Sequence, residues 1–207
     1  MDNRRLLDLF SELLSYPQEG YLGLIEVCRP LAAELDMESA NHLACFGEQL
    51  NGQNTDELQE LFVRTFDLNP ICALEVGWQL FGDNYDRGDF LVRMQEELGR
   101  CRVERSTELP DHLCHMLRLL GRMEPDRAHE LATTAVLPGL KKMLAGLEEK
   151  QSPYERVLKA VVGVLEVLHA APLRSAPQPQ AKADSLCPLS LPTVNTEHTE
   201  PLSEPLC

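Results

Sequence analysis

The sequence predicts an all-α fold, a single-domain bundle of about ten helices over residues 1–170, with a disordered tail over residues 171–207. Along the first part, apolar residues recur at spacings of three and four and β-branched runs are few, a pattern typical of amphipathic helices. The tail differs, because seven of the chain's 14 prolines lie in its final 37 residues and no hydrophobic period remains. Such a composition is typical of disorder.

The first three predicted helices follow their apolar stripes and their stop signals. An apolar stripe over residues 6–14 predicts the first helix. The second begins at Tyr21 and is expected to break or kink at Pro30, because proline lacks the amide proton that a helix interior uses. The third is predicted over residues 38–50, since Gly52 just beyond it is a typical left-handed terminator.

The next three helices are predicted between residues 54 and 98. Asn54 and Glu57 have the spacing of an N-cap and its capping-box partner, and the apolar face that follows continues to Asp67. Apolar stripes over residues 74–81 and 90–98 predict two further helices, which a polar turn joins.

Later helix starts are predicted mainly from prolines. Proline is favoured at the first helical position, so Pro110, Pro125 and Pro138 each predict the start of a helix. The segment Ser152–Glu155 combines a capping-box spacing with a first-turn proline. It predicts a last helix that runs to about Leu168.

Charge and composition exclude several classes of function. Lys and Arg total 19 against 33 Asp and Glu, a formal net charge of −14, so a nucleic acid backbone would be repelled. No run approaches the roughly 18 apolar residues of a membrane span, and stable membrane insertion is not expected. Residues 1–10 mix acids with apolar residues, unlike a secretory signal. The seven cysteines are scattered and lack a Cys-x-x-Cys pair, which favours a reduced, cytoplasmic location.

The most informative segment is residues 108–113, Glu-Leu-Pro-Asp-His-Leu. Pro110 fits the first helical position, and Asp111 is then expected in the first turn, where the helix dipole favours an anion. Neither Asp111 nor His112 lies on the apolar stripe that begins at Leu113, so replacing either is expected to leave the core intact. His112 is expected to titrate near the ordinary imidazole value of about 6.5. The segment favours recognition over catalysis.

Metal binding and catalysis are poorly supported. His112 and His115 lie three residues apart, but zinc needs three or four ligands, and Cys114 is expected to point away from the face that they share. His115 alone is equally well interpreted as a helix-surface residue. Phosphate-cradling, dinucleotide-binding and nucleophile-elbow motifs are missing. We therefore expect no catalytic residue, no metal ligand and no cofactor of the chain's own.

An aromatic cluster suggests one wall of a groove. Trp78 is the only tryptophan, with Phe81 and Tyr85 just beyond it. Core packing and a groove wall are both open interpretations of Trp78. Asp86 and Arg87 begin a turn that fits the lip of such a groove, although Asp86 fits a helix cap equally well. A pairing of Arg87 with an aspartate, Asp111 or Asp67, would orient a carboxylate there.

Three segments, 62–67, 86–91 and 109–113, together resemble the nitrate reductase assembly chaperones (NarJ, with TorD and DmsD as relatives). The resemblance implies a TorD-like all-helical chaperone that binds the N-terminal segment and the apoprotein of one molybdenum enzyme. It implies that the client is held until the molybdopterin guanine dinucleotide cofactor is inserted, and is then released for membrane attachment or twin-arginine export. Asp111 and His112 match the family's signal-segment motif. The expected client-binding residues are Leu109, Pro110, Asp111, His112, His115, Asp67, Phe66, Trp78, Tyr85, Asp86 and Arg87.

The client itself stays open within the resemblance. Nitrate reductase is the first choice, but Cys114 stands where that branch often has proline, and residues 78–82 differ from its usual run. Selenate, chlorate, dimethyl sulfoxide and hydrocarbon-oxidising molybdenum enzymes are the alternatives. A helical adaptor between folded proteins is the rival from another class, and a metal-dependent enzyme ranks last. We expect a monomer or weak dimer.

Overall fold

A computed structural model describes residues 3–104, 106–147 and 151–170, which belong to one unit, Met1–Leu173. Within these ranges the fold is all-α and contains no strand, which confirms the predicted fold class. The predicted tail over residues 171–207 lies outside the described residues. None of the helices in the described ranges is long and apolar enough to cross a membrane. The α-helices are α1 (Asn3–Leu13), α2 (Tyr21–Ala33), α3 (Met37–Gln49), α4 (Thr55–Phe62), α5 (Val76–Phe81), α6 (Tyr85–Arg100), α7 (Leu113–Leu120), α8 (Pro125–Leu131), α9 (Leu137–Leu147) and α10 (Tyr154–Leu168).

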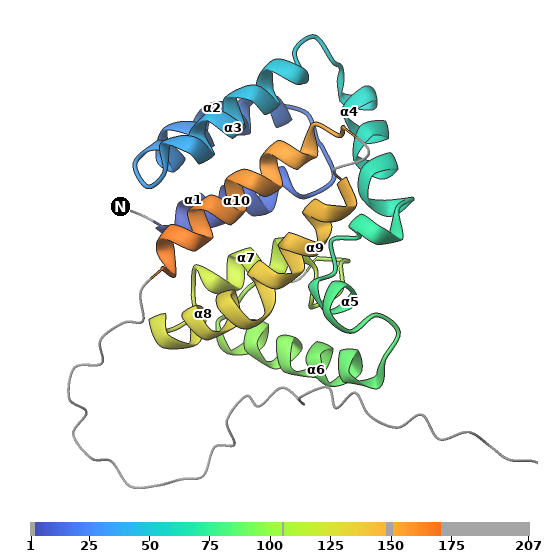
Figure 1. The fold of residues 1–207 in the computed structure, drawn as a ribbon, viewed down its shortest axis with the longest axis vertical. Coiled ribbons are helices and arrows are strands. Elements are labelled where there is room, and N and C mark those ends of the chain that lie inside the picture. The colour runs from blue at the N-terminus through green and yellow to red at the C-terminus, as the bar shows by residue number, and fades with distance from the viewer. Residues whose placement is uncertain (1–2, 105, 148–150, 171–207) are drawn as a thin grey trace, which may run out of the picture. The chain divides into compact units, whose positions relative to one another are not determined.

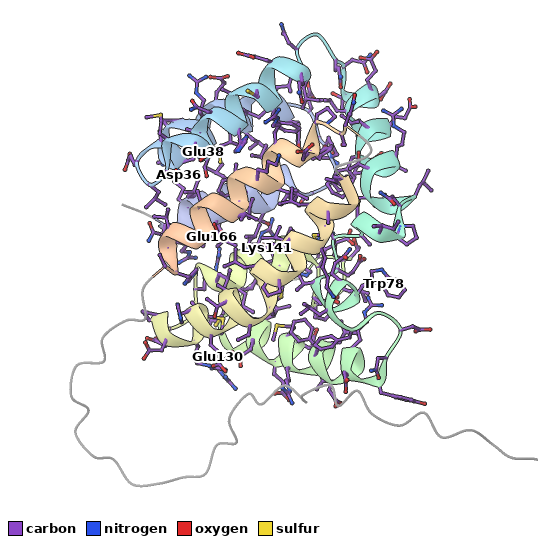
Figure 2. The ribbon with its side chains drawn as sticks, in the orientation of Figure 1. Asp36, Glu38, Trp78, Glu130, Lys141 and Glu166 are labelled. Carbon is purple, nitrogen blue, oxygen red and sulfur yellow. The ribbon has the colours of Figure 1, made fainter. Side chains whose placement is uncertain are left out.

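The core of the bundle forms around α10. This helix packs against α3 and α9, while α1 packs against α2 and α7 (Figure 1). On the surface, Lys141 of α9 and Glu166 of α10 form an ion pair of 2.9 Å (Figure 2). Inside, the fully buried Tyr154 has edge-on or tilted ring contacts with Phe46, Phe62 and Phe66. Aromatic pairs in these geometries add stability beyond the area that they bury, so this cluster fixes the end of the α4 segment.

Several predicted helix signals are confirmed. Asn54 and Glu57 form the expected capping box, with N···O distances of 3.0 and 2.8 Å. Gly52 has a φ of +84°, a left-handed conformation that glycine adopts without strain. Beyond Phe62 the chain continues into a single π-helical turn, Val63–Asp67. Turns of this kind are frequent at functional sites.

Pro30, predicted to break or kink the second helix, does not break it. The helix α2 continues through it to Ala33. Because proline has no amide proton, the carbonyl of Glu26 lacks its usual helical donor. Glu26 and Pro30 are both exposed, so water can bond to that carbonyl instead.

One predicted helix start and one predicted cap are wrong, although the last helix begins at Tyr154, within the predicted segment. Pro138 starts no new helix, because α8, a π-helical turn (Ala132–Val136) and α9 follow one another without a break. The π-helical turn accommodates the proline that follows it. The Ser152 capping box does not form either. The Ser152 hydroxyl lies 3.1 Å from the Thr65 hydroxyl, and Glu155 pairs with Lys159.

Candidate functional site

Two loop segments meet before the starts of α5 and α7. The amide of Val76 donates to the carbonyl of Asp111 at 2.9 Å, and the amide of Leu113 donates to the carbonyl of Leu74 at 2.8 Å. Glu75 and His112 thereby form an isolated antiparallel bridge. The bridge fixes both helix starts relative to each other, although Val76 and Leu113 lie far apart in the chain.

This bridge changes the predicted start of the helix that follows Pro110. Because His112 is extended and pairs with Glu75, α7 begins only at Leu113, with His112 as its N-cap. The sequence predicted Pro110 at the first helical position and Asp111 in the first turn. Both residues instead precede α7, so both predictions are wrong. The cap acceptor is the Nδ1 atom of His112, which accepts the Cys114 amide at 3.3 Å.

Asp111 stabilises a different helix from the one predicted. Its side chain is 0% exposed, and its Oδ2 atom accepts the Gly77 amide, in the first turn of α5, at 3.1 Å. The same oxygen lies 3.6 Å from Nε of Arg87. Burial raises the pKa of Asp111, while Arg87 and the Gly77 amide act against that rise. The expectation that Asp111 could be replaced without cost to the core is therefore wrong.

Arg87 connects this buried carboxylate to the tryptophan. Its guanidinium carbon lies 5.4 Å from the centre of the Trp78 ring, which is within cation–π range. The indole nitrogen of Trp78 donates to the carbonyl of Pro70 at 2.9 Å, and Figure 2 shows the ring beside α5. Asp111, Arg87 and Trp78 thus form a chain of contacts that orients the indole ring.

A pocket of about 610 Å³ opens beside these residues. Five of the predicted site residues line it: Phe66, Asp67, Trp78, Arg87 and His112. The sequence interpretation missed the rest of the lining, because those residues come from loops and helices far apart in the chain. They are Ser15, Tyr16, Phe62, Pro70, Ala73, Leu74, Glu75, Ser106, Glu108, Cys114 and Arg118.

The other predicted residues lie outside this lining. Tyr85 is 96% exposed, and Leu109 is 46% exposed. Asp86 accepts a hydrogen bond from the side chain of Asn84 at 3.3 Å. Pro110 lies between Leu109 and the buried Asp111, which contacts the pocket residue Arg87 from behind. These residues support the pocket or flank it.

His115 is buried, so its interpretation as a helix-surface residue is wrong. Its Nδ1 atom lies 2.9 Å from the carbonyl of Leu109, and its Nε2 atom accepts the Ser106 amide at 3.2 Å. His115 therefore fixes the loop that leads into α7.

The predicted direction of Cys114 is also wrong. Its side chain was expected to point away from the face that His112 and His115 share, but its sulfur lies 2.9 Å from Nδ1 of His112. The described residues contain no group of three or more side chains placed to hold a metal ion.

Carboxylates outnumber cations in the pocket. Asp67, Glu75 and Glu108 line it, against Arg87 and Arg118, and Arg87 already faces Asp111. Burial raises the pKa values of both Asp67 and Glu75. A bound cation would relieve the cost of keeping these acids ionised in a partly desolvated site, so the pocket favours a basic group beside its aromatic walls.

His112 and Cys114 stay uncharged at neutral pH. Burial, with the nearby His115, lowers the pKa of His112 to about 4, so the expected titration near 6.5 is wrong. Burial raises the pKa of the Cys114 thiol to about 11. Since a nucleophilic cysteine needs its thiolate form, this His–Cys contact is not that of an activated pair.

Comparison with known proteins identifies the family. No curated protein matches this chain. A family model described as nitrate reductase delta subunit matches residues 30–158, more than half of the 207 residues. The match includes the bridge, the π-helical turn that ends at Asp67, and Trp78 with Arg87. The chain therefore belongs to the nitrate reductase delta subunit family.

Proposed function

We propose that this protein binds the N-terminal segment of the nitrate reductase catalytic subunit before that subunit is complete. Family membership supports a nitrate reductase-associated chaperone role. On this proposal the chaperone holds the apoprotein while the molybdenum cofactor is inserted, and releases it for assembly or export. The cofactor belongs to the client, and the chaperone contributes binding and protection.

The pocket is the observation that carries this proposal. Its walls include Phe66, Trp78 and Tyr16, which offer apolar contact area for a side chain of the client. Its carboxylates favour Lys or Arg beside that apolar anchor. In such grooves, burial of apolar anchors supplies most of the affinity, and charge sets orientation and encounter rate. An amphipathic, basic N-terminal segment combines these two features, and a twin-arginine segment is one such sequence.

The family description favours nitrate reductase over the other molybdenum enzymes as the client. An adaptor between folded proteins would use exposed surface, and it would need neither the pocket nor the buried chain of contacts behind Trp78.

Calorimetric titration with a synthetic peptide tests the proposal. The peptide carries the N-terminal residues of the nitrate reductase catalytic subunit from the same organism. Asp67→Asn and Glu75→Gln each remove one carboxylate from the pocket, and each should weaken binding about 3- to 10-fold at low salt. Glu60→Gln is the matched control, because Glu60 is exposed on α4 and does not line the pocket. Equal affinities for the three variants and the unsubstituted protein would contradict the proposed site.

A further inference from the structure

The His112 ring has a defined tautomer. Its Nδ1 atom accepts the backbone amide of Cys114, and a backbone amide can only donate. The Cys114 thiol, 2.9 Å from the same atom, keeps its proton because burial raises its pKa to about 11. Nδ1 therefore carries a lone pair, and the single proton of the neutral ring is on Nε2.

The Nε2–H group of His112 remains available to a ligand in the pocket. His112 is only 6% exposed, and it lines the pocket. Within the described part of the chain, Nε2 has no hydrogen-bond partner. The atom is nevertheless accessible to solvent, since it is not one of the fully buried polar atoms that lack a partner. A donor in this position is satisfied by water when the pocket is empty. A ligand that displaces this water without accepting the hydrogen bond loses affinity.

The charges of the pocket decide which acceptor fits. Asp67, Glu75 and Glu108 would repel a carboxylate of the ligand, whereas a neutral carbonyl oxygen accepts the bond without that cost. A carbonyl inside a helix is already bonded to the amide four residues later. The matching carbonyl therefore belongs to an extended stretch or to the last turn of a helix, where carbonyls are unpaired.

We infer that His112 is a specificity-determining donor, whose Nε2–H binds a free backbone carbonyl of the client segment next to its apolar anchor. This inference rests on the proposed function. It gives the two ring nitrogens separate tasks, because Nδ1 caps α7 and Nε2 contacts the client.

Two substitutions separate these tasks. In His112→Asn, the side-chain oxygen occupies roughly the place of Nδ1 and keeps the cap, since asparagine is a favoured N-cap residue, but the donor to the pocket is lost. In His112→Gln, the amide nitrogen reaches roughly the place of Nε2 and keeps the donor, while the cap is lost. Thermal unfolding measures the cap, and calorimetric titration with the N-terminal peptide of the nitrate reductase catalytic subunit measures the donor.

The inference predicts opposite outcomes for the two variants. His112→Asn should melt close to the unsubstituted protein but bind the peptide about 3- to 10-fold more weakly, the loss expected for one neutral hydrogen bond. His112→Gln should melt lower but recover most of the affinity that the asparagine variant loses. Unchanged affinity in a folded His112→Asn protein would overturn the inference and leave His112 as a cap alone.

Peptides with single amide-to-ester replacements locate the acceptor, because an ester carbonyl accepts hydrogen bonds more weakly. One ester position should lower the affinity of the unsubstituted protein several-fold, with little effect on His112→Asn. Equal losses in both proteins at every position would overturn the assignment of a carbonyl. If the unsubstituted protein did not bind the all-amide peptide, that result would contradict the proposed function itself, and the inference that rests on it would be wrong as well.

Discussion

Removing the Asp111 carboxylate should destabilise the whole protein, and the structure sets the scale of the loss. In Asp111→Ala, the Gly77 amide loses its buried acceptor and the Arg87 guanidinium loses the carboxylate that it pairs with. An unsatisfied buried donor costs about 1–3 kcal/mol. Breaking a buried ion pair costs about 3–5 kcal/mol. Arg87 is partly exposed and lies 3.6 Å from the carboxylate, so it can turn towards water and lower the second cost. We therefore expect a total loss of about 2–4 kcal/mol.

Urea unfolding followed by circular dichroism measures this loss. Asp111→Asn keeps the volume and an acceptor for the Gly77 amide, so it should lose about 1–2 kcal/mol. Asp89→Ala is the matched control, because Asp89 is an exposed aspartate on α6, the helix that carries Arg87. It should change the unfolding free energy by less than about 0.5 kcal/mol. An equally small change in Asp111→Ala would refute the structural role of this carboxylate.

Three further predictions concern acid, glycine and the tail. With a pKa near 4 in the folded protein, His112 binds fewer protons than in the unfolded chain, so the unfolding free energy should fall by up to about 3 kcal/mol as pH drops from 6.5 to 4. Equal pH dependences for the unsubstituted protein and His112→Asn, measured by urea unfolding, would contradict this. Gly77→Ala should lower the melting temperature strongly, because its Cβ would lie 2.6 Å from Oδ2 of Asp111; an unchanged melting curve would argue against this close packing. A chain that ends at residue 170 should melt like the full chain, since the buried core of the described residues runs from Leu6 to Leu165 and the sequence after residue 170 has no hydrophobic period; a large drop would move the domain boundary.

Much of the fold follows from local patterns in the sequence. The apolar stripes and the Asn54–Glu57 capping box depend on spacings within a few residues, so they predicted the helices well. Prolines were less reliable. Pro30 and Pro138 have helical neighbours on both sides, because an exposed carbonyl and a π-helical turn accommodate them.

The candidate site was only partly predictable, because its geometry depends on long-range contacts. An acid that follows proline gives the same sequence pattern at a helix start and in a loop. The hydrogen bond from the Gly77 amide to Asp111, 34 residues away, therefore left no local signal. Histidine is not among the favoured N-cap residues, so the capping role of His112 was missed too. Tyr16 reaches the pocket from the connection between α1 and α2, through packing that no short motif encodes.

Trp78 provides the most direct test of the pocket, because it is the only tryptophan in the chain. The N-terminal peptide of the nitrate reductase catalytic subunit, made with phenylalanine in place of any tryptophan, is titrated into the protein while the emission of Trp78 is recorded. Binding in the pocket predicts a saturable change in emission, with the same midpoint as the calorimetric titration. Calorimetric binding without any change in Trp78 emission would place the client elsewhere on the protein and contradict the proposed site.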